Sequence, residues 1–141
     1  NPNFRQFFAR IFTKIINGEI PCYKVAENDR FFAFLDIAPM TKGHTLVIPK
    51  FEADKEGDYI FDMDDDMYAG LMMFSKQVAK AIEAAVPCKR VGVAVMGMEV
   101  PHVHVHLIPM NSEKDMVISN PKLKLEASEM AEIAAMIASK M

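Results

Sequence analysis

Polar and branched apolar residues alternate along the segment His102-Val-His-Val-His-Leu-Ile-Pro109. A period of two is typical of a β-strand with one buried face, so the imidazoles of His102, His104 and His106 are expected to share one face. Short runs rich in β-branched and aromatic residues predict four more strands. These strands cover residues 22–26, 30–35, 45–49 and 90–95, and the turn at 27–29 makes the first two a hairpin.

Three segments have the three-and-four spacing of apolar residues that indicates an amphipathic helix. They cover residues 3–16, 66–85 and 128–139. The aspartates before the second helix do not have the spacing of a calcium loop, so we interpret them as caps of that helix. The pattern predicts an α+β fold: an antiparallel sheet of about five strands, with an N-terminal helix, one long central helix and a C-terminal helix on one side and one edge of the sheet.

Composition narrows the class of protein. A chain of 141 residues, 51% hydrophobic and 25% charged, is expected to form a single domain over residues 1–141. The formal net charge of -3 gives no reason to expect binding of a long nucleic acid, and no apolar run approaches the ~20 residues that cross a membrane. The two cysteines, Cys22 and Cys88, form no disulfide framework or metal motif, which favours a cytoplasmic protein.

Three chemistries use imidazoles on adjacent strand positions. Three histidines can ligate zinc and leave a position for a water nucleophile, although His102 and His106 lie about 6.6 to 6.8 Å along a strand from His104 and one ion would require strong curvature. Alternatively, one imidazole attacks an electrophile while a neighbour fixes its tautomer or donates a proton. A purely structural role explains three histidines in alternation least well.

Four segments of the chain resemble the histidine triad (HIT) family, in its nucleotide-binding, Hint-like branch. They are the histidine segment itself and the segments Ile11–Pro21, Phe34–Pro39 and Gly43–Lys50, in the order and at the spacing usual for the family. The resemblance covers about residues 11–109 and implies a HIT-like fold. Residues 110–141 form a C-terminal extension.

The resemblance implies a nucleotide-binding hydrolase. Members cleave at the α-phosphate of a nucleoside 5'-monophosphate conjugate, which can be a phosphoramidate, an acyl adenylate or a dinucleoside polyphosphate, through a covalent nucleotidyl-histidine intermediate. By position, His104 corresponds to the nucleophile and His102 to the residue that orients it. His106 corresponds to the contact with the phosphate oxygens and the leaving group, and His44 to a fourth histidine beside the triad.

The same resemblance implies a site for a purine nucleotide. Asp36 falls at the position that binds the ribose hydroxyls, and the backbone amides of Glu99 and Val100 would help to hold the phosphate. The apolar slot for the base corresponds to Ile11, Phe12, Ile15, Phe34, Ile37 and Leu46.

The chain departs from the family in two places. Members usually have an asparagine and a Gly-Gln before the triad, whereas residues 91–98 here offer no side-chain amide, and Glu99 stands where a small hydroxyl residue is common. Some members bind a structural zinc through two cysteines and a histidine. In this chain Arg10 and Thr13 stand at the cysteine positions, and residues 51–53, where the histidine would lie, contain none. We therefore expect no metal and no cofactor.

The resemblance also implies a homodimer, with the helix at 66–85 as its interface. Two other functions remain open at this point. The missing amides are the reason to consider a nucleotide-binding or scaffolding module with little turnover. The three imidazoles are the reason to consider a metal-dependent hydrolase.

Overall fold

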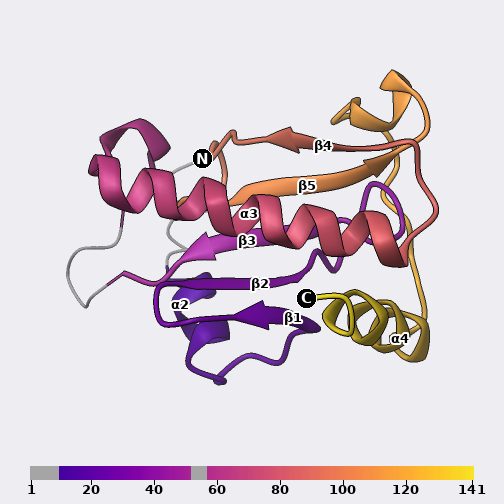
Figure 1. Cartoon of the computed structure of the whole chain (residues 1–141), viewed down its shortest axis with the longest axis horizontal. Coiled ribbons are helices and arrows are strands. Elements are labelled where there is room, and N and C mark those ends of the chain that lie inside the picture. The colour runs from indigo at the N-terminus through magenta and orange to yellow at the C-terminus, as the bar shows by residue number, and fades with distance from the viewer. Residues whose placement is uncertain (1–9, 52–56) are drawn as a thin grey trace.

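The computed structural model describes residues 10–51 and 57–141, and its centre is one antiparallel sheet (Figure 1). The strands are β1 (Lys24–Glu27), β2 (Phe31–Leu35), β3 (Thr45–Pro49), β4 (Arg90–Ala94) and β5 (Val105–Met110), in the order β1-β2-β3-β5-β4. The five predicted strands are confirmed. The histidine strand, however, starts at Val105 instead of His102, so two of the three histidines precede its hydrogen-bonded part.

Three helices accompany the sheet: α2 (Ile11–Ile16), α3 (Asp65–Ala85) and α4 (Ala127–Ala138). The turns η1 (Ile60–Asp62) and η2 (Glu113–Met116) are short 3-10 segments. Asp64 caps α3 by accepting a hydrogen bond from the Met67 N–H, which confirms that an aspartate starts this helix. The predicted N-terminal helix is confirmed in its last part, and its residues 3–9 lie outside the described residues.

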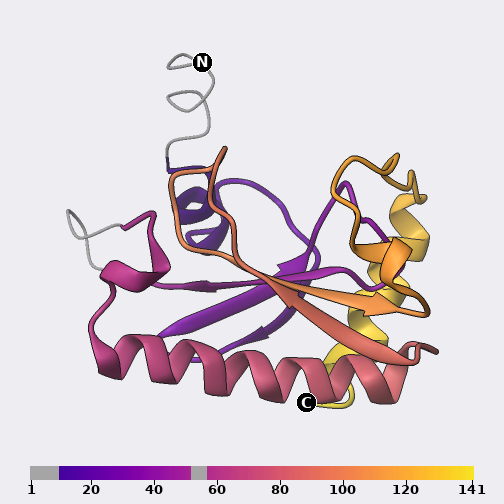
Figure 2. The same ribbon diagram turned by 90° about the horizontal axis from the view of Figure 1, so that it is seen from above.

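Helices lie on both faces of the sheet, which corrects the expectation of helices on one side and one edge (Figure 2). α3 and α4 cover one face, and α2 packs against the other. The reason is that all five residues of β2 are buried. Phe31 and Leu35 point into the α3 core, whereas Phe32 and Phe34 pack with Phe12.

Two connections bring distant segments to the α2 face. Gly43 has a φ of +93°, a conformation that favours glycine, and a side chain there would meet Val86, so the turn before His44 requires glycine. The C-terminal extension passes the same turn, where the Leu123 N–H donates to the Pro39 carbonyl over 2.9 Å. Within residues 10–51 and 57–141, no helix has the length and apolar character needed to span a membrane.

Candidate active site

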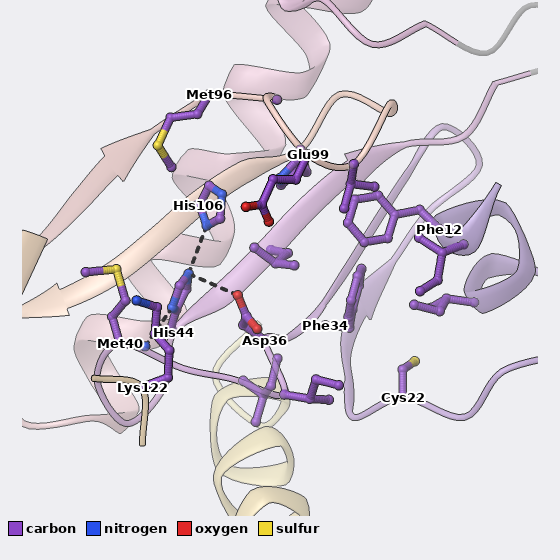
Figure 3. A pocket seen from close by; sticks show the side chains of 18 of the residues that line it. Phe12, Cys22, Phe34, Asp36, Met40, His44, Met96, Glu99, His106 and Lys122 are labelled. Atoms are coloured by element: carbon purple, nitrogen blue, oxygen red, sulfur yellow. Dashed lines mark hydrogen bonds and ion pairs between the residues drawn. The ribbon is translucent and has the colours of Figure 1, made fainter. Parts of the chain in front are cut away.

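A pocket of about 520 Å³ lies on the α2 face of the sheet (Figure 3). Three of the four predicted catalytic histidines, His44, His104 and His106, line it, whereas His102 does not. All the predicted nucleotide-binding residues also line it, namely Ile11, Phe12, Ile15, Phe34, Asp36, Ile37, Leu46, Glu99 and Val100. The structure therefore gathers residues from α2, β2, β3, β5 and the loop before β5 around one cavity.

His102 is buried beside the pocket and contacts His104 through its main chain. Its Nε2 lies 3.0 Å from the carbonyl oxygen of Pro49, and its ring packs against Phe12 and Phe51. The carbonyl oxygen of His102 is 2.7 Å from the Nδ1 of His104. The group that orients His104 in this structure is therefore a backbone carbonyl instead of the His102 imidazole.

The proton of His104 has a defined position. A carbonyl oxygen only accepts hydrogen bonds, so the Nδ1 of His104 must carry the proton that it donates to His102. Burial lowers the pKa of His104 from its ordinary value, which keeps the ring neutral at pH 7. The Nε2 atom then carries a lone pair, and the Phe12 ring, 5.1 Å away between centroids, fixes the plane of the imidazole.

His44 and His106 form a second chain of hydrogen bonds. The Met40 N–H donates to the Nδ1 of His44 over 3.0 Å, and the Nε2 of His44 lies 3.0 Å from the Nδ1 of His106. Burial lowers the pKa of His44 to about 3 and that of His106 to about 4, so both rings are neutral at pH 7. His44 therefore donates from Nε2, and His106 carries its own proton on Nε2.

Asp36 lies at the end of β2, next to this chain. Its Oδ1 accepts from the Ala38 N–H over 2.9 Å, and its Oδ2 is 3.7 Å from the Nε2 of His44. Burial raises the pKa of the Asp36 carboxyl. The remaining carboxylate capacity faces the pocket, where it can accept from hydroxyl groups.

A metal ion would fit this corner of the pocket by distance but not by protonation. One ligand atom each from Asp36, His44 and His106 lies within 4.8 Å of the others. However, the Nδ1 of His44 already accepts from the Met40 N–H, so a metal on Nε2 would require His44 to lose its single ring proton and become an imidazolate anion. The hydrogen bonds from Met40 to His44 and from His44 to His106 therefore favour protonated rings over metal ligation. The expectation of no metal stays a prediction.

Several pocket residues were not predicted from the sequence. Met96 and Met98 line the pocket from the loop that lacks the amides usual for the family, Met40 lines it beside His44, and Ile20, Pro21 and Cys22 extend the apolar slot. Lys122 reaches the pocket from the C-terminal extension, where its Nζ donates to the carbonyls of Ile118 and Asn120. No periodicity or motif links residue 122 to the histidines, so the sequence carried no signal for it.

Comparison with known proteins agrees with this geometry. The sequence profile of the HIT domain matches residues 17–113. The chain is 38% identical over 133 residues to the adenosine 5'-monophosphoramidase of Schizosaccharomyces pombe, covering 92% of this chain and 96% of that protein. It is 39% identical over 111 residues to the adenosine 5'-monophosphoramidase of Saccharomyces cerevisiae, covering 78% of this chain and 68% of that protein.

A solved structure has the same fold. A hypothetical histidine triad nucleotide-binding protein from Sulfolobus tokodaii superimposes with a TM-score of 0.75 and 30% identity, over 92% of this chain and 89% of that one. The profile match covers more than half of the chain, and the relatives exceed 30% identity over most of their length. The chain therefore belongs to the HIT family.

Proposed function

We propose that the protein hydrolyses conjugates of purine nucleoside 5'-monophosphates at the α-phosphate, with phosphoramidates as the first class to test. The observation that carries the proposal is that two Nε2 atoms differ in protonation. The Nε2 of His104 has a lone pair, and the Nε2 of His106 has a proton that it can donate in a hydrogen bond. Family membership and the two relatives named as adenosine 5'-monophosphoramidases make the chain a nucleotide hydrolase at the coarse level. The covalent intermediate, the purine base and the identity of the leaving group go beyond family membership and are what we propose.

The proposed reaction has two steps. The Nε2 of His104 attacks the α-phosphorus, and the bond from phosphorus to the leaving nitrogen breaks as that nitrogen takes a proton from solvent, which releases the amine and leaves a nucleotidyl-histidine. The His102 carbonyl continues to accept from Nδ1 and stabilises the positive charge on the modified ring. The Nε2–H of His106 donates to a phosphate oxygen as negative charge develops. Water then attacks the phosphorus and gives a proton to solvent, and the bond from phosphorus to Nε2 breaks, which releases the nucleoside monophosphate and regenerates neutral His104.

The rest of the pocket accounts for the nucleotide. Phe12 and Phe34 meet edge to face, with 5.7 Å between ring centroids, and form part of the apolar slot that we assign to the base. Asp36 stands between this slot and the histidines, as its place beside His44 shows, so its free oxygen is suited to the ribose hydroxyls. Among the described lining residues, the slot itself contributes apolar side chains and Cys22, which favours recognition by shape and stacking.

The test compares His104→Ala with His102→Gln on an adenosine 5'-phosphoramidate of a simple amine. We expect His104→Ala to lose roughly a thousandfold or more in kcat/KM, because the attacking atom is removed. His102→Gln keeps the main-chain carbonyl that orients His104, so it should retain at least about tenfold more activity than His104→Ala. Release of adenosine monophosphate is the measurement, and acid-quenched mass spectrometry should place the nucleotidyl group on His104.

Equal rates for wild type and His104→Ala would contradict the nucleophile assignment. Tight nucleotide binding by the wild type without turnover of phosphoramidates, acyl adenylates or dinucleoside polyphosphates would instead support a binding or scaffolding module. That alternative is favoured by the loop wall of the pocket, where Met96 and Met98 replace amide donors.

The proposal includes a homodimer and a cytoplasmic location. β4 is an edge strand of the sheet, and Val93 on it is an exposed apolar residue, which supports a partner at this edge. The thiols of Cys22 and Cys88 are both free, which agrees with a reducing compartment.

A further inference from the structure

Glu99 brings a negative charge into the pocket. In Figure 3 its carboxylate points inward, toward His106 and the His44–Asp36 pair. Glu99 is exposed to solvent, and within residues 10–51 and 57–141 its carboxylate has no hydrogen bond or ion pair. A charged side chain that faces a ligand cavity without a protein partner is available to a ligand.

The neighbouring groups do not neutralise this carboxylate. His44 and His106 are neutral at pH 7, because burial lowers their pKa values to about 3 and about 4. Lys122, the cation among the described lining residues, is held by the carbonyls of Ile118 and Asn120, and Figure 3 shows it at the His44 and Met40 side of the pocket. Glu99 therefore faces the triad as an uncompensated anion.

The position of Glu99 constrains the substrate. A carboxylate beside the phosphate site repels further negative charge and attracts positive charge. In Figure 3 Glu99 lies across the pocket from Asp36 and beside His106. The proposed function places the ribose at Asp36 and the phosphate at His106, so the leaving group is expected on the Glu99 side. An anionic leaving group, such as the second nucleotide of a dinucleoside polyphosphate, would be placed against it.

We propose that Glu99 selects phosphoramidates whose leaving amine carries a second, positively charged ammonium group. This inference rests on the proposed hydrolase function and names the class of its leaving group. The ammonium forms an ion pair with the Glu99 carboxylate while His104 attacks the phosphorus. An ion pair with this solvent-exposed carboxylate is worth about two- to fivefold in kcat/KM.

The experiment uses two adenosine 5'-phosphoramidates of matched length, one with pentylamine and one with 1,4-diaminobutane as the leaving amine. For each variant, the ratio of kcat/KM for the diamine to that for the monoamine is measured, because changes common to both substrates cancel in the ratio. We expect a ratio of about two to five for the wild type, near one for Glu99→Gln and below one for Glu99→Lys. Added salt should lower the wild-type ratio.

Glu132→Gln is the matched control. Glu132 is exposed on α4, which does not line the pocket, so this variant has the same net charge as Glu99→Gln and should keep the wild-type ratio. A wild-type ratio near one, or a ratio unchanged in Glu99→Gln, would overturn the assignment of Glu99 while the hydrolase function stands. Absence of turnover of both substrates by the wild type would overturn the proposed function, and the role of Glu99 with it.

Discussion

At the scale of single residues, hydrogen bonds from the main chain determine where the histidine protons lie. The His102 carbonyl holds the proton of His104 on Nδ1, and the Met40 N–H keeps the Nδ1 of His44 unprotonated. Two backbone groups thus set the nucleophilic atom of His104 and the donor atom of His106. The tautomers follow from the positions of two loops as much as from the histidines themselves.

This arrangement predicts the acid side of the pH profile. Protonation of the His104 Nε2 removes the lone pair that attacks, so activity is lost as the pH falls through the pKa of His104. Burial lowers that pKa from its ordinary value of 6.5, so the midpoint of the decline in kcat/KM should lie below pH 6.5. The measurement is kcat/KM on a phosphoramidate between pH 8 and 5, corrected for uncatalysed hydrolysis. A decline centred at or above pH 6.5 would show that the nucleophile is not desolvated.

The sequence predicted which residues gather at the pocket better than the contacts that each of them makes there. The alternation of His102 to His106 with valines placed the three rings on one face, and Val103, Val105 and Leu107 are indeed buried in the α3 core. The part played by the His102 carbonyl was not predictable, because it depends on β5 beginning only at Val105. Lys122 was missed for a similar reason, since a contact between the C-terminal extension and the pocket is formed by tertiary structure alone.

At the scale of elements, α4 completes the main core. Its Met130, Ala134 and Ile137 are buried against the sheet face that α3 also covers. Ile137 is 0% exposed, whereas its neighbour Met136 points outward and is 44% exposed. The helix lies outside residues 17–113, which the HIT profile matches, yet it shares a core with the strands that carry the site.

Ile137→Ala should therefore destabilise the whole fold. Removal of a fully buried isoleucine side chain costs about 2–5 kcal/mol in the free energy of unfolding, because it loses apolar burial and leaves a cavity. Met136→Ala, the adjacent exposed position, should cost less than about 0.5 kcal/mol. Urea denaturation followed by circular dichroism measures both. A similar loss in the two variants would mean that α4 does not pack as a buried element.

The boundaries of helices and strands were predictable where particular side chains mark them. The face of the sheet that each helix covers was not predictable. The strand at 45–49 and the helix that ends before Pro87 match β3 and α3 closely, because aspartates and a proline limit the helix. The expectation that the helices lie on one side and one edge of the sheet was wrong, because β2 is apolar on both faces and α2 packs on the face opposite α3. A continuous apolar strand has no period that tells which face receives which helix.

At the scale of the whole molecule, the sheet is open at β4. The order β1-β2-β3-β5-β4 leaves β4 with β5 as its only strand neighbour in the described sheet. An edge strand has unpaired N–H and C=O groups, and many proteins block such an edge with charge. Val93, the fourth of the five residues of β4, is instead 51% exposed. An apolar edge of this kind is suited to a second copy related by a two-fold axis, with β4 paired to β4.

The proposed dimer predicts a mass of twice the 15.9 kDa of one chain by light scattering. Val93→Lys should shift the equilibrium to monomer, because a charged side chain on the edge strand cannot be buried in the interface without a large cost in free energy. Met136→Lys is the matched control: it places the same charge on α4, which contacts β1 at the other edge of the sheet, and should stay dimeric. A wild type that remains monomeric over a hundredfold range of concentration would refute the dimer. A Val93→Lys variant that stays dimeric would place its interface away from the β4 edge.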